Sequence, residues 1–245
     1  MKIVIAADYR ELSQMAAEIV AEQVQANKNS VLGLATGSTP EGMYARLGQM
    51  HRQDNLDVSG IITFNLDEYV DLAPDHPQSY HYYMKHHFFK QVNVKSCNIN
   101  IPCTEKNNPE KVCREYDQKI NNSGGIDLQV LGIGTNGHIG FNEPGPLLSV
   151  GTHIVDLNEE TIEANSRFFK SKDEVPHRAI TMGVGSIMKA KKIMLLASGF
   201  NKAKAVKEML SGKVTTELPA SLLQLHHDSL VILDREAASL FQAKE

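Results

Sequence analysis

The sequence predicts an α/β fold in which a mainly parallel β-sheet is flanked by helices. Short apolar runs, each typical of a buried strand, alternate along the chain with amphipathic segments of helical length. This alternation is typical of βαβ units, whose strands pair in parallel. No internal repeat, low-complexity segment or linker divides the 245 residues, so we expect a single domain spanning residues 1–245.

The predicted strands are short apolar runs that end at polar or turn-forming residues. In the first half of the chain they span residues 2–6, 30–35, 60–65, 98–101 and 126–131. In the second half the same pattern predicts strands at residues 153–157, 192–197 and 229–234.

Helices are predicted between these strands from apolar residues spaced three and four positions apart. The first follows this spacing from Leu12 to Val24. The second is expected to begin near Pro40, with Ser38 or Thr39 as its N-cap. The remaining predicted helices span residues 79–89, 109–120, 159–167, 178–188, 202–210, 219–225 and 235–241.

Residues from about 144 to 187 interrupt this alternation of strands and helices. A segment of this kind can close over the ligand site of an α/β sheet. We therefore expect residues 144–187 to form a lid over the edge of the sheet.

Composition and charge exclude several classes of protein. The formal net charge is -4 and no block of Lys and Arg occurs, so a nucleic-acid-binding face is not expected. No apolar run reaches the roughly 18 residues of a membrane span, and the chain reaches Asp8 too soon for a secretory signal. Three cysteines without a C-x-x-C pair argue against a disulfide framework or a zinc site and fit a cytoplasmic protein.

Polar or glycine-rich segments follow four of the predicted strands. They span residues 36–42, 65–69, 132–145 and 198–202. Ligands of open parallel sheets bind beyond the carboxyl ends of the strands. We therefore expect these four segments to converge on one site.

The first of these segments has the features of an anion site. Hydroxyls and backbone N–H groups at the start of a helix are offered by Thr36, Gly37, Ser38 and Thr39. This segment matches neither the Walker A pattern nor the dinucleotide-binding pattern, so a small phosphate monoester is the expected ligand. Arg167 and Lys202 could add positive charge to the site. The alternatives are an ordinary capped helix start and two ordinary surface cations.

Asp67 directly follows the predicted strand 60–65. Partial burial raises the pKa of a carboxyl group above its free value of about 4, and the nearby charges of Glu68 and Asp71 would act in the same direction. Asp67 is therefore a candidate general base. The alternative is that its side chain caps the next turn.

The segment 132–145 combines five glycines with two side chains that can transfer protons. His138 has a free pKa near neutrality, and Glu143 can orient its ring and stabilise its charged form. The alternative is a glycine-rich turn with a hydrogen-bonded histidine. No G-x-S-x-G motif and no metal-spaced histidine pair occurs. Three histidines cluster on the predicted tyrosine-rich helix: His81, His86 and His87. No carboxylates are expected to converge on them, so we interpret them as surface or interface groups.

Five segments resemble the glucosamine-6-phosphate deaminase family. They are LGLATGSTP at 32–40, NLDEY at 65–69, GIGTNGHIGFNEP at 132–144, ANSRFF at 164–169 and PASLLQLH at 219–226. The resemblance covers nearly the whole chain in order. It implies a modified doubly wound (Rossmann-like) fold with a mobile lid. It also implies an enzyme that converts glucosamine 6-phosphate and water to fructose 6-phosphate and ammonia, with no cofactor and no metal.

The resemblance also implies a role for each candidate residue. Asp67 matches the base that moves a proton from C2 to C1 of the open-chain sugar. His138 matches the group that opens the sugar ring, and Asn136 and Glu143 match its supporting partners. The phosphate site matches Thr36, Gly37, Ser38, Thr39, Arg167 and Lys202.

Two departures from the family pattern affect these expectations. Many members have Asp at the position of Asn136, so His138 would depend more on Glu143 here. Allosteric members have basic residues where this chain has His153 and Val155, which are poorly suited to bind an effector phosphate. We therefore expect an unregulated monomer that acts on a small-molecule sugar phosphate.

Two other functions are compatible with parts of the sequence. A 6-phosphogluconolactonase has a similar glycine-rich loop, although the segments 67–69 and 141–144 favour the deaminase. A non-enzymatic sugar-phosphate sensor would carry a DNA-binding segment, and no basic helix-turn-helix pattern occurs in the sequence.

Overall fold

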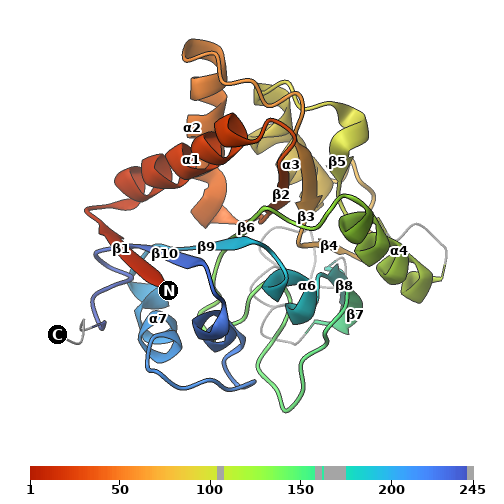
Figure 1. Cartoon of the computed structure of the whole chain (residues 1–245). Helices are drawn as coiled ribbons and strands as arrows, with labels where there is room; N and C mark the ends of the chain where they lie inside the picture. The colour runs from red at the N-terminus through yellow and green to blue at the C-terminus, as the bar shows by residue number, and fades with distance from the viewer. Residues whose placement is uncertain (104–107, 158–161, 163–174, 242–245) are drawn as a thin grey trace.

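The protein has three layers, with helices on both faces of a seven-stranded parallel sheet (Figure 1). The computed structural model describes residues 1–103, 108–157, 162 and 175–241. The strands lie across the sheet in the order β1 (Lys2–Ala6), β10 (Ser229–Asp234), β9 (Lys192–Ala197), β6 (Leu128–Leu131), β2 (Val31–Leu34), β3 (Ile62–Asn65) and β5 (Ile99–Asn100). The predicted α/β fold with a mainly parallel sheet is confirmed.

The strand order reverses between two neighbours, β2 and β6. From β2 the chain proceeds outward through β3 to β5, and from β6 it proceeds in the opposite direction through β9 to β10. The connections therefore leave this point on opposite sides, which opens a crevice at the carboxyl ends of the strands. This is the doubly wound feature that positions the candidate site.

Each face of the sheet has its own hydrophobic core. One core packs the strands against α1 (Tyr9–Ala26), α2 (Ser38–Gln53) and α3 (Tyr80–His87). The other packs them against α4 (Pro109–Asn122), α6 (Val184–Met188) and α7 (Ala203–Met209). Successive strand residues point to opposite faces, so Leu195 of β9 joins one core and Leu196 joins the other. Figure 1 shows the two groups of helices on either side of the sheet.

A second, three-stranded antiparallel sheet adjoins the first. Its order is β4 (Asp67–Tyr69), β8 (Arg178–Thr181) and β7 (His153–Asp156). The backbone of Leu66 joins the two sheets, because its N–H donates to Leu34 O at 3.0 Å and its carbonyl accepts from Met182 N at 2.7 Å. The chain therefore passes from one sheet to the other one residue before Asp67.

Three predicted details are wrong. Residues 178–188 are a strand followed by a short helix, because the buried segment 179–181 pairs with both β4 and β7. Residues 235–240 form turns rather than a closing helix, since Ser239 N and Phe241 N donate to carbonyls three residues earlier. The N-cap of α2 is Gly37, not Ser38 or Thr39.

Part of the predicted lid, residues 144–187, lies within the described structure. That part contains β7, β8 and most of α6. The helix predicted at 159–167 lies outside the described residues. None of the helices in the described part of the chain is long and apolar enough to span a membrane.

Asp117 of α4 fastens two distant segments to the body of the protein. Its carboxylate accepts hydrogen bonds from Thr152 N at 2.8 Å, Thr152 Oγ1 at 2.7 Å and Ser186 Oγ at 2.9 Å. We expect Asp117→Ala to lower the free energy of unfolding by about 2–4 kcal/mol, because it removes three bonds to a charged acceptor and leaves half-buried donors unpaired. Denaturant unfolding monitored by circular dichroism measures this change.

The matched control is Glu115→Ala on the same helix. Glu115 is exposed and forms a loose ion pair with the exposed Lys111 at 3.6 Å, so its removal is expected to change stability by less than about 0.5 kcal/mol. Equal losses of unfolding free energy in the two variants would show that the hydrogen bonds of Asp117 stabilise the fold no more than the exposed ion pair of Glu115.

Candidate active site

The four predicted strand-end segments line one cavity of about 490 Å³ at the crevice between β2 and β6. The predicted site residues that line it are Thr36, Gly37, Ser38, Thr39, Asp67, His138 and Lys202. Asn136 and Glu143 lie behind His138 and contact it or each other. Arg167 lies outside the described residues. The fold therefore brings most of the predicted residues together at one cavity.

The turn between β2 and α2 presents its polar groups to the cavity. Gly37 has φ of 97°, a left-handed conformation that favours glycine and starts α2 without a side-chain cap. Within the described structure no hydrogen bond uses the hydroxyls of Thr36, Ser38 or Thr39, so they remain available to a ligand. The first N–H groups of α2 have no partner within the helix and carry its positive dipole end.

Three tyrosine hydroxyls hold the carbonyl groups of this turn. Tyr44 Oη donates to Ala35 O at 2.6 Å, Tyr83 Oη to Gly37 O at 2.7 Å and Tyr9 Oη to Ser38 O at 2.8 Å. Because these carbonyls are bound on the protein side, the turn is fixed without any ligand. Its N–H groups and hydroxyls then face the cavity in a pre-organised arrangement.

Lys202 supplies positive charge to the same cavity. It lies in the turn Phe200–Lys202 after β9, and burial lowers the pKa of its ammonium group. No carboxylate in the described part of the chain forms an ion pair with it. A half-buried ammonium without a counter-ion attracts an anionic ligand group, which would relieve its desolvation.

Asp67 is the titratable carboxyl group in the middle of the cavity wall. Its residue is only 7% exposed, and burial together with the charge of Glu68 raises the pKa of Asp67 to about 8. The predicted contribution of Asp71 is not found, because Asp71 is exposed and contacts Arg178 Nη2 at 3.3 Å. A carboxyl group with a pKa near 8 is a stronger base than a free one once it is ionised.

Glu68 points away from the cavity, on the other face of β4. Its carboxylate is 3% exposed and accepts hydrogen bonds from Tyr69 N, Tyr80 N, His81 N and His81 Nδ1. The interpretation of His81 as a surface group without a carboxylate partner is therefore wrong. The fold brings Glu68 to it across 13 residues of sequence, which no local pattern reveals.

His138 and Glu143 lie at ion-pair distance, with His138 Nδ1 3.1 Å from Glu143 Oε1, although the two groups are not aligned as a hydrogen bond. Asn136 Nδ2 donates to the other carboxylate oxygen of Glu143 at 2.7 Å, and Asn136 Oδ1 accepts from His138 N at 3.2 Å. Burial raises the pKa of Glu143, but the imidazole and the Asn136 amide outweigh it, so the pKa lies below its usual value. Glu143 is thus held ionised beside the imidazole.

The sequence did not single out an aromatic wall beside Asp67. Tyr80 of α3 and Phe141 of the glycine-rich loop stack with ring centroids 6.2 Å apart, and both line the cavity. The backbone N–H of Tyr80 donates to the carboxylate of Glu68, 12 positions earlier in the sequence. Only the folded chain therefore shows that Tyr80 lines the cavity. Asn201, beside Lys202, is a further polar lining residue.

Metal ligands do not cluster in the described part of the chain. No group of three or more His, Cys, Asp or Glu side chains is placed there to hold a metal ion. The three cysteines are free thiols.

The family model for glucosamine-6-phosphate isomerases/6-phosphogluconolactonase matches residues 6–232 of this chain. A glucosamine-6-phosphate deaminase of Thermoanaerobacter sp. is 58% identical over 240 residues, which cover 98% of this chain and 95% of that protein. A glucosamine-6-phosphate deaminase of Clostridium acetobutylicum is 55% identical over 240 residues, which cover 98% of this chain and all of that protein.

Solved structures of the same family are also similar to this chain. A monomeric glucosamine-6-phosphate deaminase superimposes with a TM-score of 0.95 at 48% identity, covering 98% of this chain and 100% of that chain. The 6-phosphogluconolactonase of Trypanosoma brucei has a TM-score of 0.76 at 19% identity, covering 98% of each chain, and shares the fold. The chain belongs to the glucosamine-6-phosphate isomerase/6-phosphogluconolactonase family.

Proposed function

We propose that this protein is a glucosamine-6-phosphate deaminase, which converts glucosamine 6-phosphate and water to fructose 6-phosphate and ammonia. The single observation that carries the proposal is one cavity that holds both an anion-binding turn and Asp67, a buried carboxyl group with a pKa of about 8. Relatives above 50% identity across the whole chain bear the same name.

The phosphate group of the substrate would bind the turn at 36–39 and Lys202. These groups offer hydroxyls, N–H donors and an ammonium in one cavity. Arg167 is proposed as a further phosphate ligand from the sequence alone. Holding the remote phosphate fixes the sugar chain, so that C2 is presented to Asp67 with little further loss of orientational freedom.

Asp67 would act as the base of the isomerisation. Its ionised carboxylate takes the proton from C2, next to the C1 aldehyde of the open-chain sugar, while the aldehyde oxygen takes a proton from the 2-ammonium group, and an enolamine forms. The carboxylic acid then returns this proton to C1, which leaves an iminium group at C2. Water adds to the iminium carbon, ammonia departs, and the C2 ketone of fructose 6-phosphate remains. Burial of Asp67 makes it basic enough for the first step.

His138 would open the sugar ring before this step. It moves a proton between the C1 hydroxyl and the ring oxygen, and Glu143 stabilises the imidazolium that forms. Asn136 is suited to support Glu143 because its amide N–H donates to the carboxylate. An aspartate at position 136 would need a proton to make that contact.

The 6-phosphogluconolactonase alternative has weaker support. The lactonases of known structure are near 20% identical to this chain, so their likeness speaks for the fold alone. We further propose that the enzyme is a cytoplasmic monomer without a cofactor, in keeping with the monomeric deaminase that it resembles. The lid role of residues 144–187 remains a prediction.

The first test is ammonia release from glucosamine 6-phosphate, measured with glutamate dehydrogenase in a coupled assay. We expect stoichiometric ammonia and fructose 6-phosphate. A purified, folded protein that releases no ammonia but hydrolyses 6-phosphogluconolactone would overturn the proposal.

Replacement of the base gives the second test. We expect Asp67→Asn to lower kcat by about 10²–10⁴-fold, the usual contribution of a general base, with little change in inhibition by inorganic phosphate. Steady-state kinetics of the variant measures both effects. Near wild-type kcat in this variant would rule out Asp67 as the base.

The same variant should be more stable than the wild type. The folded pKa of Asp67 is about 8 and its unfolded value is near 3.8, so the folded state keeps a proton that the unfolded state has lost between these values. Wild-type stability therefore falls as pH rises from 4 to 8, and the advantage of Asp67→Asn grows to a few kcal/mol and is constant above pH 8. Urea unfolding at several pH values measures the difference, and a pH-independent difference would contradict the raised pKa.

Lys202→Met tests the phosphate site. Loss of a charge-assisted hydrogen bond is expected to raise KM for glucosamine 6-phosphate by about 10–100-fold and to weaken inhibition by inorganic phosphate similarly. Lys204→Met is the matched control, because Lys204 is exposed on α7 and does not line the cavity. Equal KM values for the two variants would show that Lys202 does not bind the substrate phosphate.

A further inference from the structure

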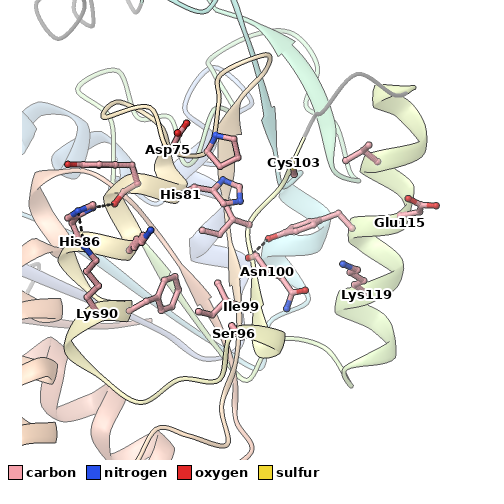
Figure 2. Close-up of a pocket in the computed structure, with 17 residues that line it drawn as sticks. Asp75, His81, His86, Lys90, Ser96, Ile99, Asn100, Cys103, Glu115 and Lys119 are labelled. Carbon is pink, nitrogen blue, oxygen red and sulfur yellow. Dashed lines mark hydrogen bonds between the residues drawn. The ribbon is translucent and has the colours of Figure 1, made fainter.

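A groove of about 790 Å³ is bounded by α3, the edge strand β5 and α4 (Figure 2). Its acidic and basic lining residues are Asp75, His81, Lys85, His86, Lys90, Glu115 and Lys119. In Figure 2 the cationic groups are spread along the groove rather than gathered at one point, so they do not form a single anion site.

The two labelled histidines of the groove differ in what they bind. His86 Nδ1 contacts the carbonyl of Tyr82 at 2.8 Å and its Nε2 lies 3.3 Å from Lys90 Nζ, so its contacts stay at the end of α3. His81 Nδ1 instead binds Glu68 Oε2 at 2.8 Å. Since the His81 side chain is 27% exposed and Glu68 only 3%, His81 is the part of this pair that solvent in the groove can reach.

Glu68 connects His81 to Asp67 in two ways. Asp67 and Glu68 are consecutive residues of β4, an edge strand of the antiparallel sheet. The Glu68 carboxylate binds N–H groups at the start of α3, so it anchors the strand that carries Asp67 to the helix that carries Tyr80. The negative charge of Glu68 also opposes the ionisation of Asp67.

We propose that His81 is a positioning residue for Asp67, acting through Glu68. Its Nδ1–H donates to the carboxylate that anchors β4 to the start of α3. The inference rests on the proposed role of Asp67 as the base. The other charged groups nearby are those of the groove on the His81 side and His138 and Lys202 on the Asp67 side.

The test compares kcat and KM in His81 variants. In His81→Phe the Glu68 carboxylate loses the side-chain donor that helps to anchor β4, so kcat is expected to fall several-fold with little change in KM. His81→Asn keeps an N–H donor and should restore most of kcat.

Two further variants serve as references. His86→Phe removes a histidine from the same helix and groove but makes no contact with Glu68, so it should keep wild-type values. Glu68→Gln removes the negative charge that opposes the ionisation of Asp67 and should move the acidic midpoint of kcat/KM to lower pH. Melting temperatures confirm that each variant is folded at the assay temperature.

The outcomes separate two failures. If the wild type releases ammonia but His81→Phe matches His86→Phe in kcat, the positioning role of His81 is wrong and the proposed function stands. If the wild type releases no ammonia from glucosamine 6-phosphate, the proposed function fails, and the inference fails with it.

Discussion

The burial of one carboxyl group where two sheets meet is the constraint on which the rest of the site depends. Leu66 bonds to the parallel sheet through its N–H and to the antiparallel sheet through its carbonyl. Asp67 follows it directly and lies opposite Thr181 of β8, so its backbone cannot move out to solvent without breaking one of these ladders. Burial and the adjacent charge of Glu68 then raise its pKa to about 8. The basicity of Asp67 is thus a property of the junction between the sheets.

The β2–α2 turn, which lines the same cavity, is fixed by a different set of contacts. Three tyrosines bind the carbonyl groups of the β2–α2 turn, which leaves its hydroxyls and N–H groups directed at the ligand. The β2–α2 turn and the base are therefore both held in place before a substrate binds. Such pre-organisation lowers the entropic cost of placing C2 against Asp67.

The sequence predicted the parallel sheet and all four strand-end segments, because apolar periodicity and the position of ligands in open sheets are local or topological rules. It could not predict β4 and β8, since strands of three and four residues depend on their partners rather than on their own pattern. The pairing of His81 with Glu68 was missed for the same reason. Glu68 was recognised as a neighbour of Asp67, but the direction of its side chain and its four donors exist only in the fold.

Direct titration of the Asp67 carboxyl group tests the central claim. Carbon-13 NMR of protein labelled at the aspartate side chains can follow this resonance, which is assigned by its loss in Asp67→Asn. We predict a midpoint near pH 8, far above that of the exposed aspartates. A midpoint near pH 4 would contradict the account, because Asp67 would then be an ordinary ionised carboxylate.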